Sequence, residues 1–512
     1  MKKVENNKFL EEALSQIPRI LGQLNRNPSS RSYGSFDRAY WHYRTNDISS
    51  ARYQEAVYTL TLLYFSKFEG NDYYKDDKVL EWIRAALYFT SKIQRPNGSF
   101  DEWYVNEGSY VATAFIAAAL GQTLMLFREN SFDLKEEVII LRILELAVEF
   151  LSQTVEETVL NQVSGAVLAI TLVGRLCNRE DFTTYSEKLL EDFLGRQNKE
   201  GWWSEYGGPD IGYLSLTVSY LEKYANLTGS KKVVEPIRRA RFFVEEFINP
   251  DHTAGGEYMS RNTEYIIPSV SLPYLGAVKP INLDDRYLCY ILYNWIETGL
   301  ETNPQATVIR DGESYFSESA ILRVANSRYF LVANGKKGGS FRLYIGGKTY
   351  YDSGLEINGF STGILDESNY VDFKSGRLES KGSLKKIKEP LLTTSVMIPF
   401  KLWQLLFGRI MFLQKTIKDF LRFRMISYAG GSEVSFRRVI EYSTQEVIVT
   451  DSIYGRVLED DIIFGVKASY NAVPSSKYAT IPEIFRRRLS PNLEEKTEND
   501  VYVIKRTFYL ND

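Results

Sequence analysis

Cysteine and histidine are both scarce in this chain, with two of each among 512 residues. Two cysteines cannot form a disulfide framework or a structural zinc site, so we expect Cys177 and Cys289 to be buried apolar side chains. The net charge is −3, and no basic arm, zinc finger or glycine-rich phosphate loop is present to indicate a nucleic-acid partner. The sequence therefore predicts no metal, no cofactor and no nucleic acid.

Residues 1–8 lack the continuous apolar core of a secretory signal, so the expected compartment is the cytoplasm. No run of about 18 consecutive apolar residues is apparent, and we expect no ordinary spanning helix. Aromatic residues are plentiful instead, at 14% of the chain. They can fill a large core, and they also form the flat amphipathic surfaces on which sugar rings stack.

The pattern of apolar and polar residues changes near residue 305. Up to about residue 300, apolar residues recur at spacings of three and four between Gly, Asn and Pro breaks, which is typical of consecutive helices. From about residue 308, apolar and polar residues alternate between Gly and Asn turns, which is typical of antiparallel strands. We predict an (α/α) toroid of helical hairpins over residues 1–305 and an antiparallel β-sandwich over residues 306–512.

One short phrase occurs twice, 103 residues apart, at residues 94–100 and 197–203. Counted from its Gly, each copy has Glu at position +4, an acid at +9 and Tyr at +12. A weaker third copy starts at Thr253, which stands where the other copies have Gly, and has Glu, Asn and Tyr at the same three positions. Such a period is typical of stacked helical hairpins whose loops share one cleft. The Gly, the aromatic residue and the +4 Glu are most simply scaffold, so function is expected at the +12 tyrosines, which are Tyr110, Tyr213 and Tyr265.

Two reactions compete for a sugar-binding groove at these loops. Hydrolysis of a glycosidic bond requires a pair of carboxyl groups, and its candidates are Glu107, Asp210 and Glu264. β-Elimination at a uronic acid requires groups that neutralise the sugar carboxylate, a base and an acid. Its candidates are Tyr110, Tyr265, His42, His252, Asn161, Gln162 and Arg261.

A basic segment interrupts the strand pattern. Residues 374–424 contain twelve Lys and Arg and three acids, a local charge of +9 that leaves −12 for the rest of the chain. Within it, residues 399–425 have apolar side chains at helical spacing, which predicts an inserted amphipathic helix. Residues 401–424 are therefore a candidate for peripheral contact with an anionic membrane, although we favour a helix docked on the sandwich.

Three stretches resemble the heparinase II/III-like polysaccharide lyases and their alginate lyase relatives. Residues 97–110, Asn-Gly-Ser-Phe-Asp-Glu-Trp-Tyr-Val-Asn-Glu-Gly-Ser-Tyr, resemble a family segment in which a Tyr transfers protons. Asn161-Gln162 resembles the Asn-His start of a helix whose Asn helps to neutralise the substrate carboxylate. Residues 338–354, from Gly-Gly-Ser-Phe-Arg to Asp-Ser-Gly, resemble the first sandwich strands.

The resemblance implies a helical toroid followed by a sandwich, and cleavage of an acidic, uronic-acid-containing polysaccharide by β-elimination. Two departures stand out: residues 334–339 lack the His that usually precedes the Ser-Phe strand, and Gln162 replaces the His of the Asn-His pair. A Gln can hydrogen-bond a carboxylate but cannot shuttle protons near neutral pH. The alternatives are a toroidal glycoside hydrolase using Glu107 and Asp210, and a non-catalytic protein that binds or assembles polysaccharide.

The predicted site combines the repeat with this resemblance. Tyr110 and Tyr265 are the candidates for proton transfer, and Asn161 and Gln162 are the candidates for neutralising the substrate carboxylate. The predicted substrate-binding residues along the groove are Trp41, His42, Arg44, Glu107, Trp203, Tyr213 and Arg261.

Overall fold

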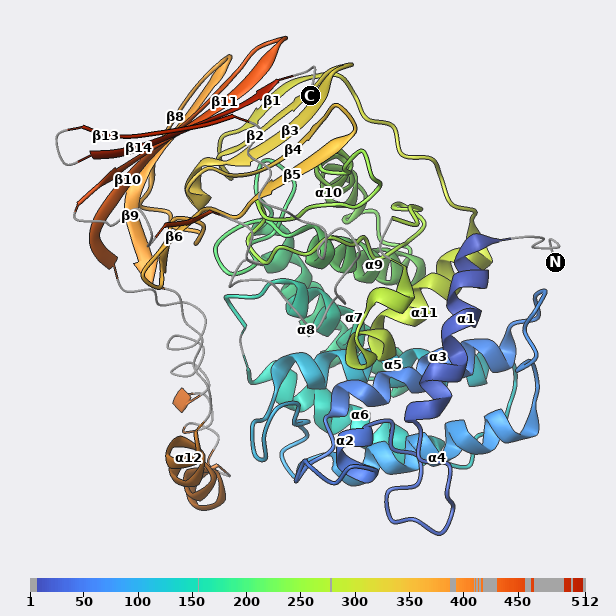
Figure 1. Cartoon of the computed structure of the whole chain (residues 1–512). Helices are drawn as coiled ribbons and strands as arrows, with labels where there is room; N and C mark the ends of the chain where they lie inside the picture. The colour runs from blue at the N-terminus through green and yellow to red at the C-terminus, as the bar shows by residue number, and fades with distance from the viewer. Residues whose placement is uncertain are drawn as a thin grey trace.

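The computed structural model describes residues 7–154, 156–276, 279–386, 393–408, 410, 413, 416–417, 431–455, 462–464, 492–498 and 501–509. A helical part precedes a β part (Figure 1). The helices are α1 (Lys8–Gln23), α2 (Arg38–Trp41), η1 (Ala51–Glu55), α3 (Ala56–Phe65), α4 (Asp77–Ile93), α5 (Tyr110–Glu129), α6 (Glu137–Ser152), α7 (Asn161–Leu176), α8 (Glu180–Gly195), α9 (Ile211–Thr228), α10 (Val234–Glu246), η2 (Pro280–Asn282), α11 (Asp285–Glu301), η3 (Gly335–Lys337) and α12 (Thr394–Phe407). The strands are β1 (Gly312–Phe316), β2 (Ile321–Ala325), β3 (Tyr329–Asn334), β4 (Ser340–Ile345), β5 (Lys348–Asp352), β6 (Leu355–Ile357), β7 (Phe360–Ser361), β8 (Tyr370–Lys374), β9 (Arg377–Lys386), β10 (Gly431–Tyr442), β11 (Glu446–Tyr454), β12 (Ile462–Phe464), β13 (Asn492–Glu498) and β14 (Val501–Tyr509).

The helical part closes on itself. Side chains of Asp76, Ser109, Asp210 and Asp284 accept backbone N–H groups at the starts of α4, α5, α9 and α11, which otherwise lack intrahelical partners. Helix α1 packs against α11, with the rings of Phe9 and Trp295 5.8 Å apart. Because the first and last helices of this part are neighbours, the helical hairpins form the predicted toroid.

Helix α5 lies in the middle of this toroid. It is long and apolar enough to cross a membrane by length and composition, so the expectation that the chain has no such run is wrong. However, 83% of its apolar window is buried inside the protein, as in a core helix. Gly165 of α7 lets the two helices approach closely, since a Cβ there would come within 2.4 Å of the Phe115 ring.

The β part is a sandwich of two antiparallel sheets. The first sheet has the order β1-β2-β3-β4-β5, and the second has the order β12-β6-β7-β9-β10-β11-β14-β13 with β8 paired to β9. Leu322, Leu331 and Leu343 of the first sheet share one apolar core with Ile440 and Val449 of the second. The predicted β-sandwich is therefore confirmed.

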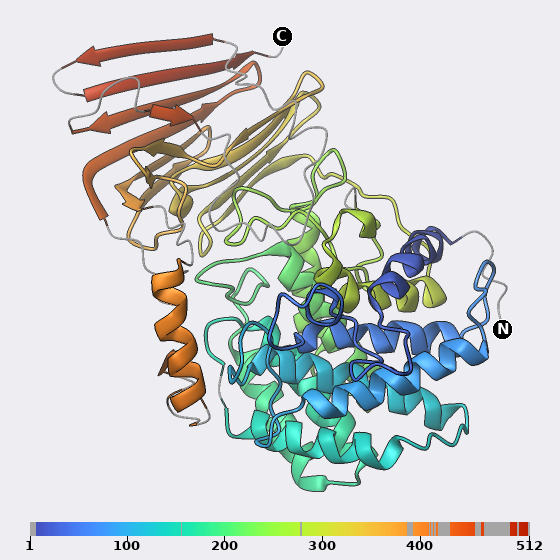
Figure 2. The same ribbon diagram turned by 60° about the horizontal axis from the view of Figure 1, so that its bottom comes forward.

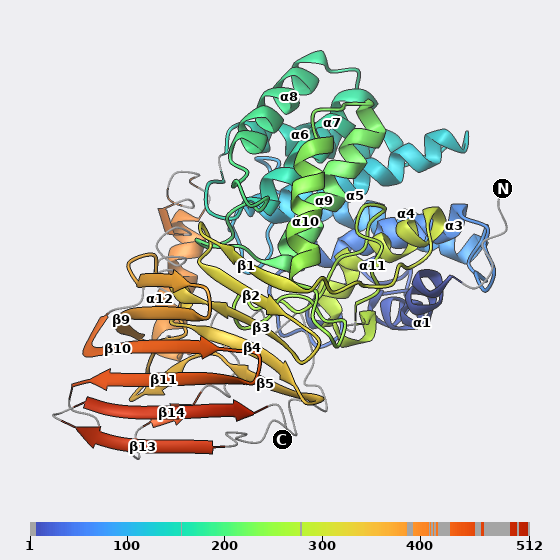
Figure 3. The ribbon, with the colours of Figure 1, turned by 90° about the horizontal axis from the view of Figure 1, so that it is seen from above.

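The other face of the first sheet covers the helical part, as the view from above shows (Figure 3). Ile321, Phe330 and Val332 alternate with the sandwich-facing residues and pack into a core that includes Phe243 and Val244 of α10. Strands β2, β3 and β4 are consequently buried on both faces, as expected for a middle layer. This contact brings the turns of the first sheet against the loops of the helical part.

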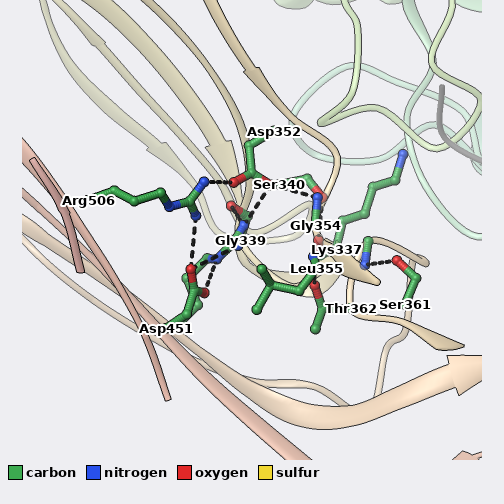
Figure 4. Close-up of polar contacts among 12 residues, drawn as sticks. Lys337, Gly339, Ser340, Asp352, Gly354, Leu355, Ser361, Thr362, Asp451 and Arg506 are labelled. Atoms are coloured by element: carbon green, nitrogen blue, oxygen red, sulfur yellow. Dashed lines mark hydrogen bonds and ion pairs between the residues drawn. The ribbon is translucent and has the colours of Figure 1, made fainter. Parts of the chain in front are cut away.

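Four charged side chains form a closed network between the two sheets (Figure 4). Arg438 bonds Asp352 at 3.0 Å and Asp451 at 2.6 Å, and Arg506 bonds the same two carboxylates at 2.6 and 2.9 Å. Burial raises the pKa of Asp352, but the two arginines lower it further, to about 2. Asp352 also accepts the N–H of Gly354 at 2.7 Å, so the Asp-Ser-Gly motif of the sequence has a structural role.

Helix α12 is inserted between β9 and β10 but leaves the sandwich (Figure 2). It contacts the helical part instead: the Phe400 and Tyr104 rings are 5.2 Å apart, and Lys401 pairs with Asp47 at 2.6 Å. The expectation that the inserted helix docks on the sandwich is therefore wrong. Most of residues 409–425 of the predicted insertion lie outside the described residues.

Candidate active site

The repeated phrase forms the same turn in both copies. The amide Nε2 of Gln94 donates to the carbonyl of Gly98 at 2.9 Å and to a carbonyl of α6 at 2.7 Å. Gln197 does the same with Gly201 at 2.9 Å and with a carbonyl of α10 at 2.8 Å. Both glycines have positive φ, and a Cβ would come within 2.0 and 2.4 Å of the facing backbone. Gln and Gly are thus scaffold that ties each loop to a neighbouring helix.

The third copy is offset by one residue from the alignment that the sequence suggests. In the second copy, the N–H groups of Asn198 and Gly201 close the turn with bonds of 2.8 and 2.9 Å. In the third copy, the N–H groups of Asn249 and His252 close the turn with equivalent bonds of 2.8 and 2.9 Å. His252, with φ 66°, therefore occupies the Gly position, and its Nδ1 bonds Thr307 Oγ1 at 2.7 Å on the exposed side of the turn.

The acids of the repeat are bound to neighbouring groups. At position +4, Glu102 bonds Arg286, Glu205 bonds Asn161, and Glu257 bonds Arg342. At position +9, Glu107 accepts the N–H of Trp103 at 2.8 Å, and Asp210 accepts the N–H of Tyr213 at 3.1 Å. Glu264 also pairs with Arg342. The carboxylates expected for hydrolysis hold loops and helix starts in place.

A tyrosine–arginine cluster forms where the second and third copies meet; it consists of Tyr206, Tyr213, Arg261, Tyr265 and Tyr287. The Arg261 guanidinium lies 4.5 Å from the centre of the Tyr206 ring. Burial opposes the charge of Arg261, and the phenols of Tyr213, Tyr206 and Tyr287 favour it. Among the described residues Arg261 has no ion pair, and its Nε is buried without a hydrogen-bond partner.

Burial controls the phenols of this cluster. It raises the pKa of Tyr213 and of Tyr265 well above the usual value, and in both cases Arg261 opposes the rise. Tyr265 is buried against Gly212, where a Cβ would come within 2.8 Å of its ring. Tyr206, Tyr213 and Arg261 are only partly buried, so they are the members of the cluster that a ligand can reach.

Two loop residues at the cluster adopt left-handed backbone conformations. Tyr206 and Asn262 both have φ 57°, and for a bulky aromatic residue this conformation is strained. Strain of this kind persists only where the surroundings fix it, and it is concentrated at functional sites. The loop of Tyr206 is fixed by the bond from the Glu205 N–H to the Gly208 carbonyl, 2.8 Å long.

The β part fixes the other loop. Lys337, at the end of η3, is fully buried, and its Nζ donates to the carbonyl of Met259 and to Oδ1 of Asn262. Asn334 Nδ2 donates to the carbonyl of Tyr258 at 2.7 Å. Burial lowers the pKa of Lys337 to about 7, against the opposing effect of Glu257 and Asp210. The residues on both sides of Arg261 are therefore held from across the domain boundary.

The start of α7 adjoins the same cluster. Glu205, the residue before Tyr206, accepts the backbone N–H of Asn161 at 2.8 Å and its side-chain amide at 3.0 Å. The Oε1 of Gln162 is buried without a partner among the described residues. Asn161 is thus joined through Glu205 to the loop of Tyr206, in the neighbourhood of Tyr213, Arg261 and Tyr265.

Tyr110 is not part of this neighbourhood. It is 4% exposed and lines a separate pocket with Glu156, Leu160, Tyr185 and other residues between α7 and α8. Burial raises the pKa of Tyr110, and Tyr185 and Glu156 raise it further. The pocket is lined by Leu160 and Val163, on either side of Asn161 and Gln162 in the sequence, and joint action of Tyr110 and Tyr265 on one sugar stays a prediction.

The predicted groove residues are dispersed. Trp203 is 2% exposed and stacks on Phe193 at 4.8 Å, so it is a core residue and cannot line a groove. Trp41 is partly buried and donates its Nε1–H to the Gln23 carbonyl at 2.8 Å, while His42 and Arg44 are exposed. No described interaction joins these last three residues to the tyrosine–arginine cluster.

Trp103 lies in the loop of the first copy, where the sequence predicts a sugar-binding groove, and its side chain is 64% exposed. The Arg286 guanidinium lies 4.4 Å from the Trp103 ring and 5.1 Å from the Tyr287 ring, which links Trp103 to the cluster. A signal was present, since each +4 Glu is followed by an aromatic residue: Trp103, Tyr206 and Tyr258. The first two of these carry an arginine on their ring.

Within the described ranges, no three His, Cys, Asp or Glu side chains are grouped so that they could hold a metal ion. Comparison with known proteins bears on the chemistry instead. Residues 23–265 match the family model described as the ulvan lyase N-terminal domain. No curated protein matches the sequence of this chain.

The fold is shared with solved polysaccharide lyases. A chondroitin AC lyase from Streptomyces coelicolor A3, in complex with chondroitin sulphate, matches with a TM-score of 0.52 and 11% identity. The match covers 87% of this chain and 66% of the lyase chain. This chain thus spans 66% of the length of that lyase chain. Heparinase III has a TM-score of 0.46 and 12% identity, covering 88% of this chain and 78% of its own. The predicted resemblance to polysaccharide lyases and the predicted order of toroid and sandwich are confirmed.

Proposed function

We propose that this protein is a polysaccharide lyase that cleaves an acidic, uronic-acid-containing polysaccharide by β-elimination. The observation that carries the proposal is the partly exposed Arg261, which has no ion pair within the described part of the chain, lies over the Tyr206 ring and is adjacent to Tyr213. A guanidinium in such a place suits a planar carboxylate, because its fork of donors matches two oxygens. The match to the ulvan lyase N-terminal domain supports the same reaction class.

The reaction needs three roles, and the described residues supply candidates for each. Arg261, with the amides of Asn161 and Gln162, neutralises the sugar carboxylate and so makes the proton on the adjacent carbon easier to remove. Arg261 opposes the rise that burial causes in the pKa of Tyr213 and of Tyr265, and a phenol beside this guanidinium is our candidate base. In our assignment Tyr213 removes the proton and Tyr265 supports it, while a second phenol of the cluster protonates the leaving oxygen.

Trp103 gives the polymer a second point of contact. Its ring is mostly exposed, and Arg286 beneath it is in turn held by the buried Glu102. The Trp103 N–H is bonded to Glu107 at 2.8 Å, so the loop presents the ring in a fixed orientation. A rigid aromatic face beside the cluster is suited to stacking on a sugar ring.

The test offers the purified full chain a panel of acidic polymers, beginning with ulvan, chondroitin sulphate and heparan sulphate. The expected result is absorbance from an unsaturated uronic acid product. Tyr213→Phe should abolish it, whereas Tyr110→Phe, which removes the same hydroxyl from the separate pocket, should leave most of it. Loss in Tyr110→Phe alone would place the reaction in that pocket.

The two alternatives predict other products. New reducing ends without the absorbance would indicate a hydrolase, although Glu107 and Asp210 are both bonded to backbone N–H groups. Saturable binding with neither product would indicate a protein that binds polysaccharide without cleaving it. No absorbance with any uronic-acid polymer rejects the lyase.

A further inference from the structure

Helix α12 presents its polar side to the protein and its apolar side outward. Gln404 is fully buried, and neither its Nε2 nor its Oε1 has a partner among the described residues. The remaining contacts on that side are polar or mixed: Asn106 Nδ2 donates to the Gln404 carbonyl at 3.0 Å, and Lys401 pairs with Asp47. The Phe400 ring also contacts the Tyr104 ring on that side, but burying an amide without partners is unfavourable, so apolar contact alone does not explain this docking.

Ile398, Leu402, Leu405 and Leu406 line the outward side and are between 55% and 69% exposed, and Val396 and Phe407 near the two ends of the helix are 52% and 45% exposed. A surface helix normally buries its apolar stripe and exposes its polar face. Here the arrangement is reversed over most of a helix of 14 residues. A contiguous exposed apolar patch on a helix marks a surface that meets another apolar phase or partner.

The length of α12 and the charge of the residues that follow it in the sequence favour a lipid membrane as the apolar phase. At about 1.5 Å per residue, α12 is much too short for the about 20 residues that a spanning helix needs. Such a helix lies in the plane of the membrane interface with its apolar face among the acyl chains. In the sequence, residues 409–424 add five Lys and Arg and one acid, and such a basic segment beside an apolar face is attracted to anionic headgroups.

We propose that α12 is a membrane-contact surface that lies in the headgroup plane of an anionic lipid bilayer. The geometry suits a flat surface, because α12 is a single helix that stands beside the toroid (Figure 2) and its large apolar side chains are exposed. The docked side, through Phe400 and Lys401, then fixes the helical part to the membrane and keeps the loop of Trp103 next to it. This surface is independent of the lyase activity proposed above.

Flotation of the full chain with vesicles tests this surface without any substrate. The protein should float with vesicles of phosphatidylcholine containing about one third phosphatidylglycerol, and much less with phosphatidylcholine alone. The triple variant Leu402→Gln, Leu405→Gln and Leu406→Gln should bind at least about tenfold less. The matched control is Val138→Gln with Ile139→Gln, which removes two exposed apolar side chains of α6 and should float as the wild type does.

Circular dichroism and thermal unfolding of each variant show that the fold is intact. The proposal is overturned if the wild type does not float with anionic vesicles, or if the triple variant floats as well as the wild type does. It is also overturned if light scattering shows a dimer that the triple variant dissociates, because a second copy would then cover the face.

Discussion

Replacing Arg261 with methionine tests the proposed site most directly. The side chain has no described ion pair, its guanidinium stacks at 4.5 Å on Tyr206, and it lies within electrostatic range of Tyr213 and Tyr287. Two charge-assisted hydrogen bonds to a substrate carboxylate contribute about 1.5–3 kcal/mol each. Their loss, about 3–6 kcal/mol, should lower kcat/KM by about 10²- to 10⁴-fold.

The stability of the fold should change much less. The substitution removes a cation–π contact of about 0.5–2 kcal/mol, but it also removes the cost of burying the Arg261 charge, which the nearby phenols and Asp210 oppose. We expect the free energy of unfolding, from urea titration, to change by no more than about 1 kcal/mol. Arg261→Lys keeps the charge without the planar fork and should retain intermediate activity.

Arg310 provides the matched control. Its guanidinium also lies over an aromatic ring, that of Phe242 at 5.6 Å, but it is ion-paired with Glu245 on the surface. Arg310→Met should keep at least about half of the initial rate in the unsaturated-product assay, because surface ion pairs contribute little. Our assignment is refuted if Arg261→Met retains wild-type kcat/KM, or if Arg310→Met loses as much as Arg261→Met.

Three further predictions concern stability and binding. Asp451→Asn leaves Arg438 and Arg506 with one carboxylate fewer in a buried network, so urea denaturation should show a loss of about 3–5 kcal/mol; a loss under 1 kcal/mol would contradict it. Lys337 is neutral in the folded protein above pH 7 but protonated in the unfolded chain up to about pH 10. The unfolded state therefore binds the extra proton. Between pH 7 and 9 the free energy of unfolding of the wild type should rise by up to about 1.4 kcal/mol per pH unit relative to that of Lys337→Met. The control Lys348→Met, at an exposed lysine of the same sheet, should show the same pH dependence as the wild type. Trp203→Ala should destabilise the fold by about 3–5 kcal/mol. Trp103→Ala should leave the melting temperature unchanged and should weaken polymer binding measured by calorimetry. Equal losses of stability in the two variants would contradict the different burial of Trp203 and Trp103.

Local patterns in the sequence determined the architecture. Helical and alternating periodicities follow from which face of each element is buried, and they located the toroid and the sandwich without any knowledge of packing. The scaffold role of the repeat was also predictable, because the Gln and Gly of residues 94–98 and 197–201 act through bonds to their own turn and to a neighbouring helix.

The site required the tertiary structure, since it depends on contacts between loops that are far apart in the sequence. The +12 position is equivalent in the sequence for Tyr110 and Tyr213, yet the first faces the Tyr185 pocket and the second faces Arg261. The third copy contributes Arg261, and Lys337 of the β part bonds Met259 and Asn262 on the two sides of it. Sequence periodicity specifies which face of a helix is buried but not which loops contact each other. Those contacts depend on how the first sheet docks on the toroid.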